Sequence, residues 1–233
     1  MQALLNQAAR DGYTRGFVDA LREGARTDDC DALTILAMFH RDGLRGERGE
    51  VLIRKNARLA LSYDLRAAEL GEPSAMASIA DALTSPPSSS SNLARDTLYK
   101  RAFRLGNTTA ALNLAATYQN LGRYRDAVRW FRRALAAGDP SALLELAKAE
   151  LLGMGTRRNV PAAFERLRRL ARGVAFTAPF ERTEAMEIMA DAFRNGWLVR
   201  RDYPQAIRLL RKAASLGSDA ARGLLVDEGF DVS

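Results

Sequence analysis

The stretch Asn107–Ala142, NTTAALNLAATYQNLGRYRDAVRWFRRALAAGDPSA, contains two amphipathic helical patterns that meet at Leu121-Gly122. The apolar residues of the second pattern recur on one helical face: Ala127, Trp130, Phe131 and Ala134. Small residues in such a face let two helix backbones approach closely, and large ones fill the groove of the partner helix. The stretch therefore predicts a helical hairpin, whose second apolar side needs further copies of the unit to pack against.

Similar units recur along the chain. Four second helices carry a basic residue and an alanine near their end, followed four residues later by a glycine: Arg66-Ala67 with Gly71, Arg101-Ala102 with Gly106, Arg133-Ala134 with Gly138, and Lys212-Ala213 with Gly217. A fifth, degraded copy ends at Gly173. Each first helix carries a large aliphatic residue followed by a small one: Leu36-Ala37, Ile79-Ala80, Leu114-Ala115, Leu146-Ala147 and Met189-Ala190. The glycine spacing is typical of helix-turn-helix solenoids.

The units resemble two known repeat families. The unit at Asn107–Pro140 is similar to a tetratricopeptide repeat, on Leu114-Ala115, Tyr118, Ala127, Phe131 and Ala134. The stretches Gly153–Ala163 and Gly196–Ala206 resemble the Sel1-like repeat, with its glycine turn, short spacer and the alanine that begins the second helix. The resemblance covers roughly residues 13 to 227. It implies an all-α fold, a right-handed α-solenoid of stacked helical hairpins, that is, a Sel1-like or tetratricopeptide-like superhelix.

We expect one repeat domain over residues 1–233 because the repeat phase continues without a break. Its parts are an abbreviated N-terminal repeat or cap (1–24), five helical hairpins (31–71, 74–106, 107–138, 140–173 and 181–217) and a C-terminal cap (218–233). The turns within 43–56 and 81–92 depart from the repeat pattern: the first is too long, and the second lacks the glycine.

Three segments carry local predictions. We expect Gln2–Ala9 to form a short opening helix. The prolines and serines of Thr84–Asn92 predict an exposed turn without helix. In the apolar insertion Gly173–Phe180, Phe176 and Phe180 either tuck over the edge of the core, which we favour, or stand exposed as a contact.

Catalytic and metal-binding patterns are absent from the sequence. His40 is the sole histidine and takes a packing position of the repeat, and Cys30 is the sole cysteine. The glycine-rich stretch Gly43–Gly49 follows a helix, whereas a phosphate-binding loop follows a strand. We therefore expect no enzymatic activity, no catalytic residue, no metal and no cofactor.

The sequence also bears on the compartment. No apolar run approaches the roughly 18 to 20 residues that cross a bilayer. Met1–Arg10 lacks the features of a signal peptide, so we expect a cytoplasmic protein. The alternative is an exported protein whose signal peptide has been processed.

The formal net charge of +7 is concentrated between Arg123 and Arg172. In tetratricopeptide-like stacks the second helices lie on the convex side, so the resemblance implies a basic convex patch of Arg125, Arg129, Arg132, Arg133, Arg166 and Arg169. This patch is either a solvated face or a surface for an acidic protein partner or another anionic surface. Nucleic acid is not expected, because Trp130 and Phe131 fall on the packing face and are unavailable for base stacking.

The first helices should line a concave groove if the resemblance holds. The groove positions it implies are Thr34, Met38, Arg41, Ala77, Asp81, Thr84, Leu112, Ala116, Gln119, Leu144, Lys148, Leu151, Glu187, Asp191 and Arg194. We expect a non-catalytic scaffold or adaptor that binds a peptide, helix or protein through this groove, the basic patch, or both. The alternatives are an immunity or inhibitor protein that blocks a toxin or enzyme through one face and, least favoured, an enzyme with a cryptic site. The identity of the partner and the oligomeric state stay open.

Overall fold

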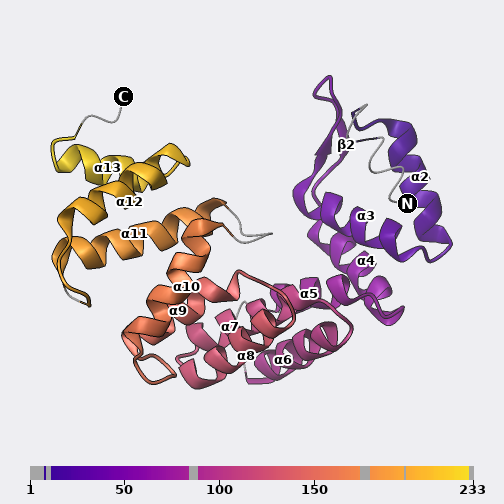
Figure 1. The fold of residues 1–233 in the computed structure, drawn as a ribbon. Helices are drawn as coiled ribbons and strands as arrows, with labels where there is room; N and C mark the ends of the chain where they lie inside the picture. The colour runs from indigo at the N-terminus through magenta and orange to yellow at the C-terminus, as the bar shows by residue number, and fades with distance from the viewer. Residues whose placement is uncertain (1–7, 9–11, 84–88, 174–178, 197, 231–233) are drawn as a thin grey trace. The chain divides into compact units, whose positions relative to one another are not determined.

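A computed structural model gives the fold of the protein (Figure 1). It describes residues 8, 12–83, 89–173, 179–196 and 198–230. The fold class is confirmed: helices follow one another as antiparallel hairpins of an α-solenoid. The chain divides into two compact units, Met1–Ala110 and Ala111–Ser233, and each is described by itself. That residues 1–233 form one domain stays a prediction.

The first unit consists of helices and one small hairpin of strands. Its elements are α2 (Arg15–Arg26), α3 (Cys30–Asp42), β1 (Leu44–Arg45), β2 (Val51–Ile53), α4 (Ala57–Glu69), α5 (Pro73–Ala82), α6 (Ser89–Arg104) and the start of α7 (Thr108–Asn120). Helices that follow one another pack together, as with α3 on α4 and α5 on α6. Leu21, Leu33 and Leu36 are fully buried in its core, where small residues such as Ala32 allow the helices to approach closely.

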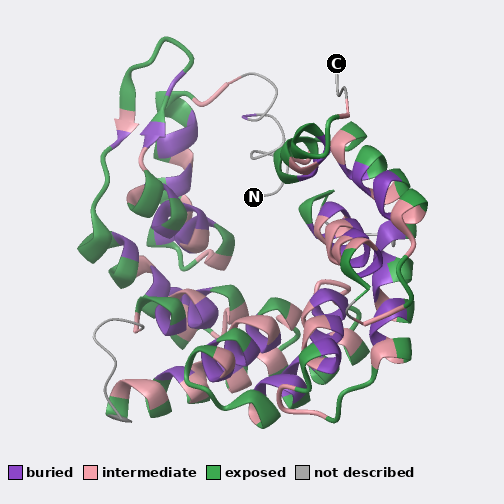
Figure 2. Ribbon diagram, turned by 90° about the vertical axis from the view of Figure 1, so that its left-hand side faces the viewer, coloured by how far each residue is buried: buried purple, intermediate pink, exposed green. Residues whose placement is uncertain are grey.

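The second unit continues the series of hairpins. It contains the rest of α7, then α8 (Tyr124–Ala136), α9 (Ala142–Leu152), α10 (Val160–Arg172), α11 (Pro179–Asn195), α12 (Tyr203–Ser215) and α13 (Asp219–Asp227). Figure 2 shows the buried residues on the helix faces that meet their neighbours. Leu146, Leu167 and Leu210 are fully buried. As predicted from their spacing, Trp130 and Phe131 also lie on the packing face of α8.

The same backbone hydrogen bond closes three of the turns between paired helices. The residue that caps the second helix donates its N–H to the carbonyl three residues before the turn glycine. The pairs are Asn159 to Glu150 (2.9 Å), Asp202 to Phe193 (2.9 Å) and Asn56 to His40 (2.6 Å). In each case the side chain of the capping residue also accepts an N–H from the first turn of the helix. The three turns therefore end in the same pair of hydrogen bonds, which we call the turn closure.

The long turn at residues 43–56 is an insertion that leaves this closure intact. Between Gly43 and Asn56 the extra residues pair as β1 and β2, with Leu44 opposite Ile53. Leu44 and Ile53 are buried on the core of the first unit. The extra length of this turn is thus a β-hairpin inserted between α3 and α4, the two helices of one repeat.

Two local predictions are wrong, and others lie outside the described residues. Ser89–Asn92 are helical, although Thr84–Asn92 is predicted to be an exposed turn, because serine is favoured at the start of helices as well as in loops. Phe180 is 64% exposed at the start of α11, so it does not tuck over the core. Residues 84–88, Phe176 and, apart from Ala8, the predicted helix Gln2–Ala9 lie outside the described ranges.

Candidate functional site

A cavity of about 520 Å³ is lined by residues of α9, α11 and α13 of the second unit, and we call it the groove cavity. Its apolar lining consists of Leu151, Leu152, Ile188 and Leu224. Its charged lining consists of Lys148, Glu184, Glu187, Asp191 and Arg194. The residues from α11 follow one another at helical spacing, so they occupy one face of that helix. Leu152 is 61% exposed, which leaves apolar surface open to a partner.

The charges on α9 are paired within the cavity. Lys148 Nζ lies 2.6 Å from a carboxylate oxygen of Glu184 and 3.0 Å from one of Glu145. Burial opposes the charged form of Lys148, but hydrogen bonds to these two carboxylates raise the pKa of its amine above the ordinary value. Lys148 is therefore cationic at neutral pH, and it joins the first helices of two successive repeats, α9 and α11.

The charges on α11 are paired in the same way. Arg194 lies 3.4 Å from Asp191 and 3.2 Å from Glu228. The hydroxyl of Tyr203 also donates to Glu228, at 2.7 Å. The cap of α13, Ser218, donates its hydroxyl to Glu187. The cations of the groove cavity are thus neutralised, and carboxylates remain in excess around the apolar surface.

The structure brings together part of the predicted groove. Lys148, Leu151, Glu187, Asp191 and Arg194 all line the groove cavity. Leu112 and Gln119 are half-buried on α7 and do not line it. The prediction that Leu144 lines a groove is wrong, because its side chain is 3% exposed and packs in the core of the second unit.

The predicted groove residues of the first unit lie elsewhere. Thr34, Met38 and Arg41 follow one face of α3, and Met38 is exposed. Arg41 donates to Ser78 of α5 at 2.9 Å and pairs with the buried Asp64 of α4 at 3.4 Å. Burial raises the pKa of Asp64 to about 6, and the Arg41 guanidinium offsets this only in part.

Asp81 on α5, a further predicted groove residue, accepts a hydrogen bond from the hydroxyl of Tyr99. Its carboxylate is therefore held against α6 within the same hairpin. The lining of the groove cavity does not include Asp81.

Sequence reasoning missed four members of the groove cavity. Leu152 directly follows the predicted Leu151. Glu184 lies three residues before the predicted Glu187, and Ile188 lies three residues before the predicted Asp191. The helical period of α9 and α11 could therefore have identified all three. Leu224 had no such signal, because α13 follows the last repeat and has no equivalent copy that would set its register.

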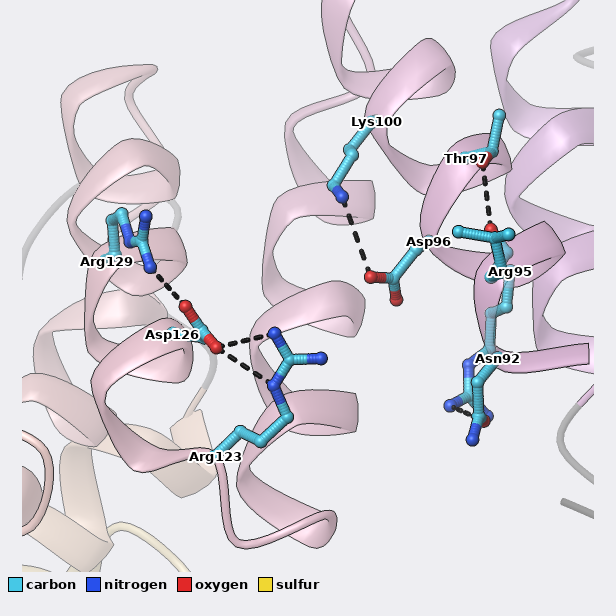
Figure 3. A network of polar contacts seen from close by, with 9 residues as sticks. Asn92, Arg95, Asp96, Thr97, Lys100, Arg123, Asp126 and Arg129 are labelled. Carbon is cyan, nitrogen blue, oxygen red and sulfur yellow. Dashed lines mark hydrogen bonds and ion pairs between the residues drawn. The ribbon is translucent and has the colours of Figure 1, made fainter. Parts of the chain in front are cut away.

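Only some arginines of the predicted basic patch are exposed without a side-chain partner among the described residues. Figure 3 shows Asp126 between Arg123 and Arg129, with 2.7 Å between Asp126 and Arg123. These arginines lower the pKa of Asp126 through the hydrogen bond from Arg123 and their charges, against the effect of burial. Arg132 donates to Thr156 at 3.3 Å, and Arg133 stacks 4.5 Å above the Trp130 ring. Arg125 and Arg169 are exposed.

Arg166 does not belong to that patch. It is half-buried and lies 3.0 Å from the buried carboxylate of Glu150. The prediction for Arg166 is wrong because this pairing neutralises it and turns it toward α9. Between Arg123 and Arg172, fewer cations are therefore exposed and unpaired than the sequence alone suggests.

His40 takes the predicted packing position. Its ring stacks on Tyr63 with the centroids 5.8 Å apart, and Nδ1 lies 3.3 Å from the carbonyl oxygen of Arg54. Burial lowers the pKa of His40, against the effect of that hydrogen bond. In the described ranges no group of three or more His, Cys, Asp or Glu residues could hold a metal ion. None of the helices there has the length and apolar character that spanning a bilayer requires.

Two family models match the chain. The Sel1 repeat model matches residues 31–72, 140–172 and 183–218. The tetratricopeptide repeat model matches residues 108–137. No curated protein matches the chain.

Solved structures share the fold at low sequence identity. A Sel1 repeat protein from Oxalobacter formigenes is 18% identical, with 94% of this chain and 86% of that chain covered and a TM-score of 0.71. A protective antigen of uropathogenic Escherichia coli with an SLR fold is 21% identical, with a TM-score of 0.70. The match covers 93% of this chain but only 45% of the antigen's length. An immunity protein from Pseudomonas aeruginosa is 16% identical, with 94% of this chain and 82% of that chain covered and a TM-score of 0.55.

Proposed function

The chain is a repeat protein of the Sel1-like and tetratricopeptide-like family, and from this premise we propose that it is a non-catalytic scaffold that docks a partner segment in the groove cavity. The observation that carries the proposal is the apolar surface of Leu152, Ile188 and Leu224 beside polar groups that are already paired. Apolar surface that rigid helices hold open is suited to bind an apolar side chain of another protein.

The charge of the cavity indicates what the partner segment contains. The three carboxylates of the lining, Glu184, Glu187 and Asp191, outnumber its two cations, Lys148 and Arg194. Glu145 and Glu228, outside the lining, add to this excess because each pairs with one of the two cations. A segment with an apolar anchor between Lys or Arg residues complements this excess, whereas an acidic segment is repelled. We therefore expect a basic, amphipathic peptide or helix in the groove cavity.

A second candidate function is inhibition of a toxin or an enzyme through one face. The likeness to an immunity protein supports only the compatibility of the fold with that role. An inhibitor binds one target tightly and abolishes its activity, whereas a scaffold binds segments of several proteins without affecting catalysis. Stoichiometry and target activity therefore separate the two functions.

Selection from a displayed peptide library tests the groove cavity directly. We expect wild-type protein to enrich peptides with an apolar residue flanked by Lys or Arg. Leu152→Asp should weaken their binding by about tenfold or more, since it removes apolar contact and adds a repelled charge next to the partner anchor. The matched control is Leu121→Asp, which changes an exposed leucine of the same unit outside the cavity. Unchanged binding by Leu152→Asp would refute the assignment.

A further inference from the structure

Each of the three turns that share the turn closure carries two adjacent cations just before the capping residue. The sequences are Arg54-Lys55-Asn56, Arg157-Arg158-Asn159 and Arg200-Arg201-Asp202. The shared hydrogen bond fixes the capping residue that directly follows each pair, so the two cations take the same place in all three turns. This regularity concerns the turns, whereas the predicted basic patch concerns the second helices.

Among the described residues the turn cations have no carboxylate partner, a state that they share with some helix arginines such as Arg125 and Arg169. All six are exposed, and in the described part of the chain none of them forms an ion pair. By contrast, Arg129, Arg166 and Arg194 on the helices each have a carboxylate partner within 4 Å. Unpaired guanidinium groups keep their full capacity for bidentate hydrogen bonds to carboxylates.

In the second unit, two successive turns meet and form a hollow beside these cations. Gly155 approaches the backbone of Tyr124 so closely that a Cβ atom there would lie 2.1 Å from the Tyr124 carbonyl oxygen. Around this junction lie a cavity of about 650 Å³ with Arg123, Arg125 and Arg157, and one of about 590 Å³ with Arg132, Arg157 and Arg158. Thr156 and Arg157 line both cavities.

The carboxylates in these two cavities do not cancel the charge. Asp126 is held between Arg123 and Arg129, and Glu150 is held by Arg166. Arg125, Arg132, Arg157 and Arg158 therefore remain without a carboxylate partner among the described residues, and Arg132 donates a hydrogen bond to the neutral Thr156. We call the surface formed by Arg125, Arg157 and Arg158 with the two cavities the turn edge.

We propose that the turn edge binds an acidic segment of a partner protein. Carboxylates suit clustered guanidinium groups, and the two cavities, whose linings share Thr156 and Arg157, give room for an extended peptide. Tyr118 lies beneath Arg123, at 4.4 Å, and Trp130 is buried beneath Arg133, so these two rings cannot stack on a base. Tyr124 lines the first cavity and is 37% exposed, so the test below includes an oligonucleotide as a competing ligand. This site shares no lining residue with the groove cavity, although Leu152 of that cavity directly precedes Gly153 of this site, and the proposal does not rest on the function proposed for the groove cavity.

Fluorescence anisotropy with labelled decaglutamate tests the proposal on the full chain. We expect Arg157→Glu with Arg158→Glu to weaken binding by about tenfold or more, because two attractive charges become repulsive. The matched control is Arg169→Glu with Arg208→Glu, which makes the same charge change at two exposed arginines of α10 and α12. This control should weaken binding by less than about threefold. Circular dichroism confirms that both variants are folded, and Arg157→Gln with Arg158→Gln serves if charge reversal disturbs the turn.

Three outcomes would overturn the proposal. The first is equal weakening by the two charge-matched variants, which would mean that only net charge matters. The second is equal binding of a decaglutamine peptide. The third is preference for a single-stranded oligonucleotide over decaglutamate at the same salt concentration, which would assign the surface to nucleic acid.

Discussion

The groove cavity and the turn edge of the second unit use charged residues in opposite ways. In the groove cavity, Lys148 and Arg194 are paired with carboxylates, so the surface left for a partner is apolar. At the turn edge, Arg157 and Arg158 are unpaired, so the surface left for a partner is cationic. The difference teaches that composition alone does not locate a binding surface in a repeat protein, because some cations, such as Lys148 and Arg194, are neutralised by nearby carboxylates while others, such as Arg157 and Arg158, are not.

The largest expected effect comes from the core that supports both surfaces. Leu146 of α9 is fully buried. Its replacement by alanine should lower the free energy of unfolding by about 2 to 5 kcal/mol, through lost burial and a cavity. Urea denaturation measures this loss. An unchanged unfolding midpoint would contradict the packing of α9 and the register of the repeats.

The next effect separates the turn edge from the groove cavity. Gly155 and Gly122 both have φ of +71°, but only at Gly155 would a Cβ meet backbone atoms. Gly122→Ala should cost about 1 kcal/mol for the left-handed conformation alone. Gly155→Ala should cost about 2 to 4 kcal/mol, because the two turns must also move apart. Equal unfolding midpoints for the two variants would show that the turns are not in contact. Peptide binding by the groove cavity should persist in both.

A smaller effect tests whether paired helix charges always stabilise the fold. Asp64 has a pKa of about 6 in the folded state, above its ordinary value of 3.8. Between about pH 4 and pH 6 the folded state holds a proton that the unfolded state has lost, so stability should fall as pH rises through that window. Asp64→Asn should remove this fall and raise stability at pH 7 by about 1 to 3 kcal/mol. A parallel pH profile for wild type and variant, measured by urea denaturation, would refute the raised pKa.

The smallest effect concerns the pairing inside the groove cavity. Lys148→Met leaves Glu145 and Glu184 without their shared cation and should cost about 1 kcal/mol at low salt. Adding Glu184→Gln should restore part of the loss, since it removes the repulsion between the two carboxylates. The double-mutant cycle measures this coupling. No coupling would show that Lys148 does not bridge α9 and α11.

The fold was predictable from the sequence because the packing residues repeat. Ala37, Ala115 and Ala147, which the repeat pattern singles out, are all completely buried. The strands β1 and β2 were not predictable, because two- and three-residue strands are too short for a period of two to be recognised. The serines at the start of α6 were misjudged because their preference for loops is also a preference for helix starts.

The site was predictable only in part. The family resemblance implied that Lys148, Glu187, Asp191 and Arg194 line a groove, and the structure brings these four residues to one cavity. Leu144 failed because it turns into the core, and Leu224 was missed because the terminal helix has no repeated counterpart. The free or paired state of each arginine depends on contacts between helices, which a single sequence does not encode locally.

The most direct test is the binding of one groove peptide, selected from the library, to three proteins: wild type, Leu152→Asp, and the double variant Arg157→Glu with Arg158→Glu. We predict that Leu152→Asp weakens binding by about tenfold or more, whereas the double variant binds as tightly as wild type or more tightly. Loss of binding in both variants, or in the double variant alone, would contradict the account that the groove cavity and the turn edge are separate surfaces with opposite partners.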